Sequence, residues 1–376
     1  MSHNNQNDVT DHHSPLFWGE RACETLMRSY SPPQLPPENQ WHYHQGVYLY
    51  GMYRLWEQTG KEEYYNYFKA YVDHLVDEYG NFLFRRDELD AIQAGLLLFP
   101  LYRLTKHSKY KLAAQKLRNL FNTLNKTAEG GFWHKDKYPY QMWLDGLYMA
   151  GPFACIYALM FNEPELIDMV LKQERLMRSH MKDPQTGLYY HGWDESKQTA
   201  WSDPVTGCSP EVWGRSLGWY GMALADIIEV LPENHSGRKE LIETLRAYLE
   251  SVIRYQDEET GMWYQVIDKG SEPDNWLETS ASCLFIYTIA KAVNLGVAEQ
   301  KLINAADKGF KGVIEQKVKT REDGLLSLED ICIGTSVGVY DYYVNRERSA
   351  NDLHGVGAFI LACVELHKNK AGKRGN

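Results

Sequence analysis

The sequence lacks the features that mark several large classes of protein. No apolar run is long enough to cross a bilayer, and the N-terminus shows no basic segment followed by an apolar one. We therefore expect neither a membrane span nor a secretory signal. We expect a soluble cytoplasmic protein. The six cysteines stand singly among mostly apolar neighbours, without a Cys-x-x-Cys pair, which predicts reduced, buried thiols.

Positive charge is also scarce. Forty Lys and Arg stand against fifty Asp and Glu, a formal charge of -10, which argues against nucleic acid or an anionic membrane as a partner. An acidic ligand would therefore need a local basic cluster.

Motifs for metal, nucleotide and serine chemistry are missing as well. There is no HExxH, Walker or GxSxG signature, and GVGAF at 355–359 lacks the third glycine of a dinucleotide site. The His-x-His at 42–44 does not by itself make a metal ligand set. We expect no metal and no organic cofactor, which leaves acid–base chemistry.

Aromatic residues are abundant, at 13% of the chain with 26 Tyr and 11 Trp. Aromatic faces suit stacking against sugar rings, although many tyrosines are equally compatible with a large helical protein.

One unit recurs along the chain: a helix, a short turn, an amphipathic helix and a loop that opens with glycine and aromatic residues. The loops are GNFLFR at 80–85, GGFWHKD at 130–136, GLYYHGWDE at 187–195, GMWYQV at 261–266 and DGLLSLED at 323–330. Segment 236–256 carries one apolar stripe, which is typical of an outer helix, whereas 147–160 and 353–364 are apolar all round, as a helix buried on every side should be.

This alternation predicts an all-α fold, an (α/α)6 barrel of six helical hairpins. Inner helices are expected near 42–58, 87–105, 141–160, 211–231, 275–294 and 350–367. Outer helices are expected near 61–79, 107–125, 164–181, 236–256 and 298–319, and helix 16–31 would close the ring. We expect a single catalytic domain over 16–367, a loosely ordered N-terminus at 1–15 and a C-terminal tail at 368–376.

Residues at the starts of the inner helices should share a central pocket. The candidates with chemistry are His42, His44, Asp87, Glu88, Asp90, Asp145, Glu211, Arg215, Glu278, Asp352 and His354. Several of these must simply cap helices, and we assign Glu278 and Asp352 to that role.

Asp145 and Asp90 are the most informative carboxylates. Asp145 stands in Trp-Leu-Asp-Gly-Leu-Tyr at 143–148, where aromatic neighbours would favour its protonated form and hence a general acid. Helix capping explains it equally well. Asp90 also precedes a stretch of small residues, and such a pair suits sugar chemistry in which one carboxyl protonates and the other orients water or tunes its neighbour.

Arg215 stands between Trp213 and Trp219 and offers a planar guanidinium to a ligand carboxylate. The alternative is a buried ion pair with Asp203 or Glu211. His191, His134 and Lys135 lie on loops and could add positive charge to the pocket, or could simply be polar surface.

Longer motifs carry a more specific signal: WHYHQG, DELDAIQAGLLLFPLY, WLDGLYMAGPF, YYHGWDES, WSDPVTGCSPEVWGRSLGWYGMAL and GTSVGVYDYY. With these motifs the sequence resembles glycoside hydrolase family 105, the unsaturated rhamnogalacturonyl hydrolases, over about residues 16–367. The resemblance implies an (α/α)6 barrel that acts on a small oligosaccharide, as a monomer or weak homo-oligomer.

The resemblance also implies residue roles and a mechanism. Asp145 would protonate C4 of the C4=C5 bond in an unsaturated galacturonyl residue, water would add at C5, and Asp90 would help to position that water. The residues implied to bind the saccharide are His42, Tyr43, His134, Lys135, Asp136, Lys137, Tyr138, Trp143, His191, Arg215, Trp219 and Thr335. The alternatives are an unsaturated glucuronyl hydrolase acting on glycosaminoglycan fragments, a sugar 2-epimerase and a non-catalytic saccharide-binding barrel.

Overall fold

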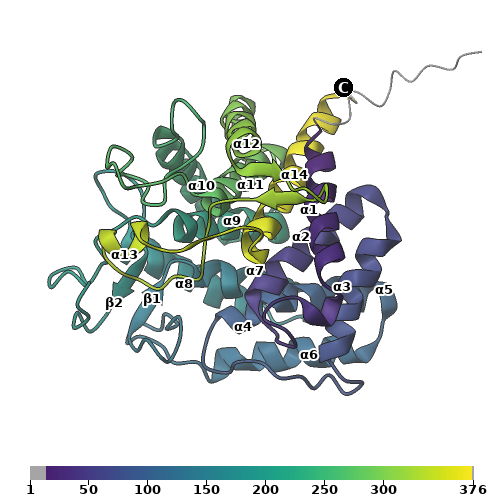
Figure 1. The fold of residues 1–376 in the computed structure, drawn as a ribbon. Coiled ribbons are helices and arrows are strands. Elements are labelled where there is room, and N and C mark those ends of the chain that lie inside the picture. The colour runs from purple at the N-terminus through teal and green to yellow at the C-terminus, as the bar shows by residue number, and fades with distance from the viewer. Residues whose placement is uncertain (1–13, 375–376) are drawn as a thin grey trace, which may run out of the picture.

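The computed structural model describes residues 14–374, and Figure 1 shows a mostly helical chain with long loops. The inner helices are α2 (Tyr43–Thr59), α4 (Asp90–Gln93) with η3 (Ala94–Leu97) and α5 (Leu98–Thr105), α7 (Gly146–Phe161), α9 (Gly214–Val230), α11 (Thr279–Asn294) and α14 (Leu353–Arg374). The outer helices are α1 (Pro15–Ser29), α3 (Glu62–Leu75), α6 (Ser108–Arg118) with η4 (Asn119–Asn122), α8 (Glu165–Met181), α10 (Ser236–Arg254) and α12 (Ile303–Lys317).

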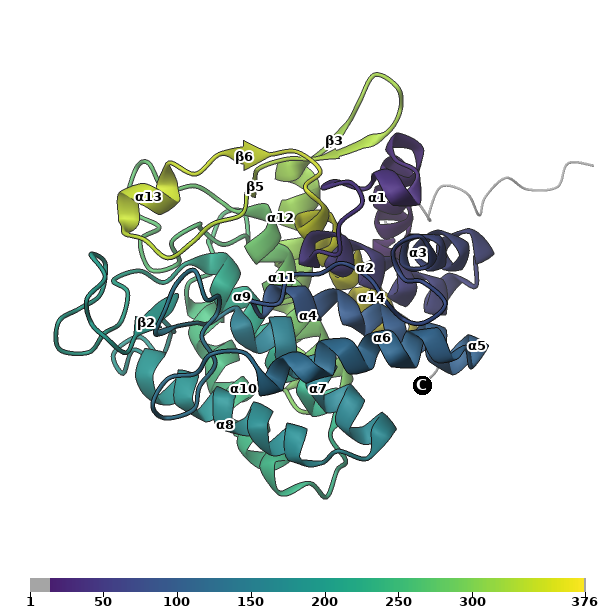
Figure 2. The same ribbon diagram turned by 90° about the horizontal axis from the view of Figure 1, so that it is seen from below.

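The inner helices form a closed ring. Each packs against the next in chain order, and α14 returns to pack against α2. Each also packs against one outer helix, with α1 paired to α14. In Figure 2 helices α2, α4, α9, α11 and α14 lie near the centre, and α1, α3 and α8 lie outside them. The predicted (α/α)6 barrel is therefore confirmed.

The burial of the two helix types follows from their sequences. Helix α10 buries one stripe that includes Leu241, Leu245 and Leu249, whereas α7 is buried almost all round. One large apolar cluster extends from Ala22 to Leu366. All six cysteines are free and buried, as predicted. Within residues 14–374, no helix has the length and apolarity that a bilayer crossing requires.

The second inner helix is interrupted, which the sequence pattern did not predict. The expected helix 87–105 consists of α4, the 3-10 turn η3 and α5. The cause is Pro100, which has no N–H to donate and whose ring would clash with the carbonyl of Leu96 in a regular α-helix. Position 95 in this segment requires glycine, because a Cβ there would lie only 2.6 Å from the ring of Phe153, too close for any side chain.

Short strands precede or follow some helices. They are β1 (Gln141–Trp143), β2 (Gly192–Asp194), β3 (Val318–Thr320), β4 (Leu326–Leu328), β5 (Ile331–Cys332) and β6 (Arg348–Ser349), joined by the 3-10 turns η2 (Pro32–Gln34) and η5 (Gln300–Leu302) and by helix α13 (Tyr340–Val344). They form three antiparallel pairs, β1 with β2, β3 with β4 and β5 with β6. Helix α7 thus begins at Gly146 rather than 141, because 141–143 is a strand.

The expected boundaries at the chain ends are only partly tested. The loosely ordered N-terminus expected at 1–15 lies mostly outside the described residues, and α1 already begins at Pro15. The tail expected at 368–376 is wrong for 368–374, where α14 continues. Side-chain contacts hold this last part of α14. Lys368 pairs with Glu365 at 2.8 Å, and the amide of Asn369 donates to Asn294 Oδ1 at 3.0 Å.

Candidate active site

A cavity of about 630 Å³ opens at the end of the barrel where the inner helices begin. This volume lies in the usual range for small-ligand sites. The predicted site residues that line it are His42, Tyr43, Asp90, His134, Lys135, Lys137, Tyr138, Trp143, Asp145, Arg215 and Thr335. The predicted convergence of helix starts on one pocket therefore holds for these residues.

Asp145 immediately precedes α7, but its side chain caps no backbone N–H of that helix. Only its carbonyl serves the helix, accepting from Tyr148 and Met149. The carboxylate is 8% exposed and lines the cavity, with Oδ2 lying 3.2 Å from His191 Nε2. The capping alternative is therefore wrong for the side chain, which is left for chemistry in the pocket.

The aromatic neighbours expected around Asp145 are only partly there. Trp143 lines the same cavity, but Tyr148 stacks on Trp219 at 4.9 Å, and Phe153 packs against Phe99 at 5.0 Å. The difference arises because successive helical residues point in different directions, so a motif that is continuous in sequence is not continuous in space.

His191 reaches Asp145 through strand pairing. Trp143 of β1 lies opposite Gly192 of β2, and the N–H of Leu144 donates to the carbonyl of His191 at 2.9 Å. The imidazole is fully buried behind Asp145 rather than lining the cavity. Burial lowers the pKa of His191, against the opposing effect of Asp145, so the ring is neutral near pH 7.

Tyr343, which the sequence analysis missed, fixes the orientation of that imidazole. Its hydroxyl accepts the N–H of Gly338 at 3.0 Å and lies 2.7 Å from His191 Nδ1. The hydroxyl can donate its own proton to Nδ1, and in that tautomer the imidazole proton lies on Nε2, facing Asp145 Oδ2. Oδ2 of Asp145 thus lies against the imidazole, while its carboxylate lines the cavity. The motif GTSVGVYDYY contains this tyrosine, but the resemblance assigned a role only to Thr335.

Asp90 has a different environment, although it lines the same cavity. Its Oδ1 lies 3.1 Å from His134 Nε2 and its Oδ2 lies 2.5 Å from Lys135 Nζ. Burial alone would raise the pKa of Asp90, but His134 and Lys135 outweigh burial and hold that pKa well below its usual range. Asp90 is therefore an anion at working pH and cannot be the proton donor.

Aromatic rings lie beside these two carboxylates. Trp143 stacks on His134 with ring centres 4.5 Å apart, and Tyr138 lies 4.7 Å from the same indole. Trp143 is 4% exposed and lines the cavity. Tyr138 and Lys137 are more exposed and form the rim.

Arg215 is buried without a carboxylate partner among the described residues. It is 1% exposed, stacks over Trp213 at 4.4 Å, and donates to the carbonyls of Cys332 and Ile333, the latter at 2.7 Å. The alternative of an ion pair with Asp203 or Glu211 is wrong. Glu211 pairs with Lys269, and Asp203 accepts N–H groups of its own turn.

Besides His191, two residues implied to bind the saccharide do not line the cavity. Asp136 is exposed and accepts from Asn125 at 3.0 Å. Trp219 is 1% exposed and lies one helical turn below Arg215, stacked on Tyr148. Both are corrections to the predicted site.

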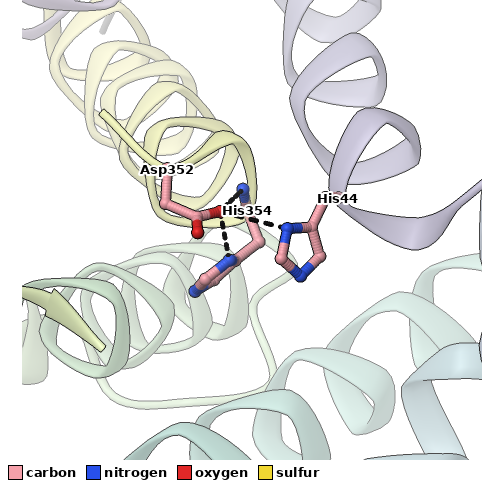
Figure 3. Close-up of side chains that lie close together, drawn as sticks. All are labelled: His44, Asp352 and His354. Carbon is pink, nitrogen blue, oxygen red and sulfur yellow. Dashed lines mark hydrogen bonds and ion pairs between the residues drawn. The ribbon is translucent and has the colours of Figure 1, made fainter. Parts of the chain in front are cut away.

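Glu278 and Asp352 were expected to cap helices. Glu278 does so, because its carboxylate accepts the N–H of Ala281 at the start of α11. Asp352 accepts the N–H of His354 at 3.4 Å and also contacts two imidazoles, as Figure 3 shows.

Comparison with known proteins identifies the family of this chain. The sequence model of Glycosyl Hydrolase Family 88 matches residues 18–370. The chain belongs to this family. A solved structure from C. acetobutylicum ATCC 824, a glycoside hydrolase from family 105, is 34% identical with a TM-score of 0.88, over 93% of this chain and 99% of that one. The resemblance to family 105 is thereby confirmed, and the protein is a glycoside hydrolase.

Curated relatives are more distant. Unsaturated rhamnogalacturonyl hydrolase YesR of Bacillus subtilis (strain 168) is 29% identical over 248 residues, 64% of this chain and 68% of that protein. Protein Atu3128 of Agrobacterium fabrum is 32% identical over 230 residues, 58% of this chain and 97% of that protein.

Proposed function

We propose that this glycoside hydrolase releases the unsaturated galacturonyl residue from the non-reducing end of rhamnogalacturonan oligosaccharides, and that Asp145 is its proton donor. The observation that carries the proposal is the contrast between the two pocket aspartates. Asp90 is kept ionised by Lys135 and His134, whereas Asp145 contacts a neutral imidazole through one oxygen and has the other oxygen available.

The unpaired charge of Arg215 supports a substrate that carries a carboxylate. A buried guanidinium without an anion is costly, and two backbone carbonyls compensate it only in part. Of its five N–H donors, two serve those carbonyls, which leaves donors for a uronate. The name of the Bacillus relative, an unsaturated rhamnogalacturonyl hydrolase, agrees with such a substrate.

The reaction is a hydration of the enol ether at C4=C5. Asp145 gives its proton to C4, and the positive charge that develops at C5 and the ring oxygen is attacked by water. The water returns a proton to the Asp145 carboxylate, and Asp90 helps to orient that water. The resulting hemiketal opens and releases the shortened saccharide and a 4-deoxy-5-keto-uronate, so the acid is regenerated in each cycle.

Turnover in heavy water tests this chemistry. We expect one deuterium at C4 of the released uronate, detected by NMR, because the proton on Asp145 exchanges with solvent. Ordinary acetal hydrolysis leaves C4 unlabelled and would contradict the proposal. Parallel rates on unsaturated galacturonyl-rhamnose and on an unsaturated glucuronyl disaccharide decide the substrate, and preference for the latter would favour a glycosaminoglycan-fragment hydrolase.

A further inference from the structure

A compact cluster of three side chains, His44, Asp352 and His354, lies at one side of the cavity and has no part in the proton transfer described above. Asp352 Oδ1 is 3.1 Å from His44 Nδ1 and 2.7 Å from His354 Nδ1 (Figure 3). His44 belongs to the first turn of α2, and the other two stand at the start of α14. His354 is fully buried, whereas the side chain of His44 is 17% exposed and lines the cavity.

The charges within the cluster are set by its surroundings. Burial alone would raise the pKa of Asp352, but His354 and His44 outweigh burial and hold that pKa well below its usual range. Burial lowers the pKa of His354 to about 4, although Asp352 opposes this shift. At neutral pH the cluster therefore contains an anionic carboxylate and a neutral, buried imidazole at hydrogen-bonding distance.

This arrangement selects the tautomer of His44. An anionic carboxylate accepts only, so the nearby Nδ1 of His44 carries the ring proton and Nε2 keeps a free lone pair. In Figure 3 the second nitrogen of His44 points away from Asp352. The cluster thus presents a hydrogen-bond acceptor on a side chain that lines the cavity.

The other groups around His44 offer different hydrogen-bonding chemistry. His42 lies 4.9 Å away between ring centres, and its Nδ1 already accepts the N–H of His44. Tyr43, 4.4 Å away, keeps its hydroxyl proton because burial raises its pKa, so it can donate as well as accept. Arg215 acts on His354 from α9 and can only donate.

We propose that His44 binds the saccharide by accepting a hydrogen bond from one of its hydroxyl groups, and that Asp352 and His354 are positioning residues that hold its ring. The inference rests on the proposed function in that the ligand is the unsaturated saccharide. Sugars carry many hydroxyl donors, and an imidazole whose ring is held in one orientation discriminates among their positions. His354 contributes by fixing the carboxylate and by packing edge-on against His44 at 4.8 Å.

The same three residues are also of the type that bind a metal ion, and their ligand atoms lie within 4.8 Å of one another. Electrostatics favours the hydrogen-bonding role. The charge of Arg215 already lowers the pKa of His354, and the N-termini of α2 and α14 add positive potential, which stabilises an anion and disfavours a cation.

The test measures KM and kcat at neutral pH for wild type, His44→Phe, His44→Gln and Asp352→Asn. His44→Phe keeps a ring but has no acceptor, so it should raise KM about tenfold. Its kcat should stay close to wild type, because His44 has no part in the proton transfer. His44→Gln keeps an acceptor, so its KM should stay close to wild type.

Asp352→Asn removes the anion that holds Nδ1 of His44, so it should raise KM while kcat stays close to wild type. His74→Phe, an exposed histidine of α3, is the matched control and should leave KM unchanged. If Asp352→Asn does not fold, the contrast between the Phe and Gln variants at 44 carries the test.

Three outcomes would overturn the inference. Wild-type KM in His44→Phe, together with normal wild-type turnover, refutes it and leaves the proposed function intact. Stoichiometric Zn²⁺ binding in calorimetry that Asp352→Asn abolishes makes the cluster a metal site instead. Failure of the wild-type enzyme to act on any unsaturated saccharide refutes the proposed function and this inference together.

Discussion

Replacing Asp145 by asparagine removes an acidic proton while preserving the shape of the side chain. The folded structure should tolerate the change, because the carboxylate caps no helix and its one close polar contact is His191. Loss of a single such contact costs about 0.5–1.5 kcal/mol. We therefore expect Asp145→Asn to unfold within a few degrees of the wild-type Tm.

The effect on turnover should be far larger. General acids usually contribute about 10²–10⁴ in rate. Protonation of carbon is the difficult step of enol ether hydration, and Asp90, already ionised, cannot replace the missing donor. We therefore expect a loss in kcat of about 10⁴, which corresponds to about 5 kcal/mol of transition-state stabilisation.

The assay follows the ultraviolet absorbance of the conjugated double bond, which disappears on hydration. Asp323→Asn, on the exposed β3–β4 hairpin, is the matched control and should retain wild-type kcat. Because Gly146 follows position 145, the introduced asparagine can deamidate back to aspartate, so Asp145→Ala must be measured alongside. A kcat within about tenfold of wild type in both variants would refute Asp145 as the acid.

Three further predictions concern charged residues. Arg215→Met should raise KM at least about tenfold for the uronate substrate but much less for its methyl ester; equal effects would contradict carboxylate binding. Lys291→Met breaks a buried ion pair at the far end of the barrel, so it should destabilise the fold by about 3–5 kcal/mol in urea unfolding without changing KM. The pKa of Asp90 is lower in the folded protein than in the unfolded chain, where it is about 3.9. The ionised carboxylate therefore stabilises the fold above that pH, and this stabilisation is lost as pH falls. Wild type should therefore lose more stability than Asp90→Asn between about pH 5 and 3, and parallel curves would refute this.

The ring of helices could be predicted because its cause is local. Segment 236–256 shows its buried stripe in the spacing of its own leucines, and 147–160 shows its burial on nearly every side in its lack of charge. Cα spacing and side-chain direction within a helix are fixed, so this pattern is sufficient to separate outer helices from inner ones.

The contacts inside the pocket could not be predicted, because they depend on pairings between distant segments. The β1–β2 register brings His191 to Asp145, and the carbonyls of Cys332 and Ile333 hold Arg215; neither leaves a periodic signal in the sequence. Trp219 was misplaced for a related reason. It shares a face with Arg215 four residues earlier, but the cavity ends above it.

Buried cations have different partners at the two ends of the barrel. At the far end Lys291 contacts both Asp226 at 2.6 Å and Glu229 at 2.7 Å, so its charge is matched within the protein. At the pocket end Arg215 is as deeply buried, but no carboxylate of residues 14–374 forms an ion pair with it. It donates to backbone carbonyls and stacks on an indole face, and Glu278 and Asp145 act on its charge only from beyond ion-pair distance. Because a buried charge is stable only when an opposite charge compensates it, a matched cation serves the fold. A buried cation beside a cavity that lacks an ion-pair partner would be compensated by the charge of an anionic substrate.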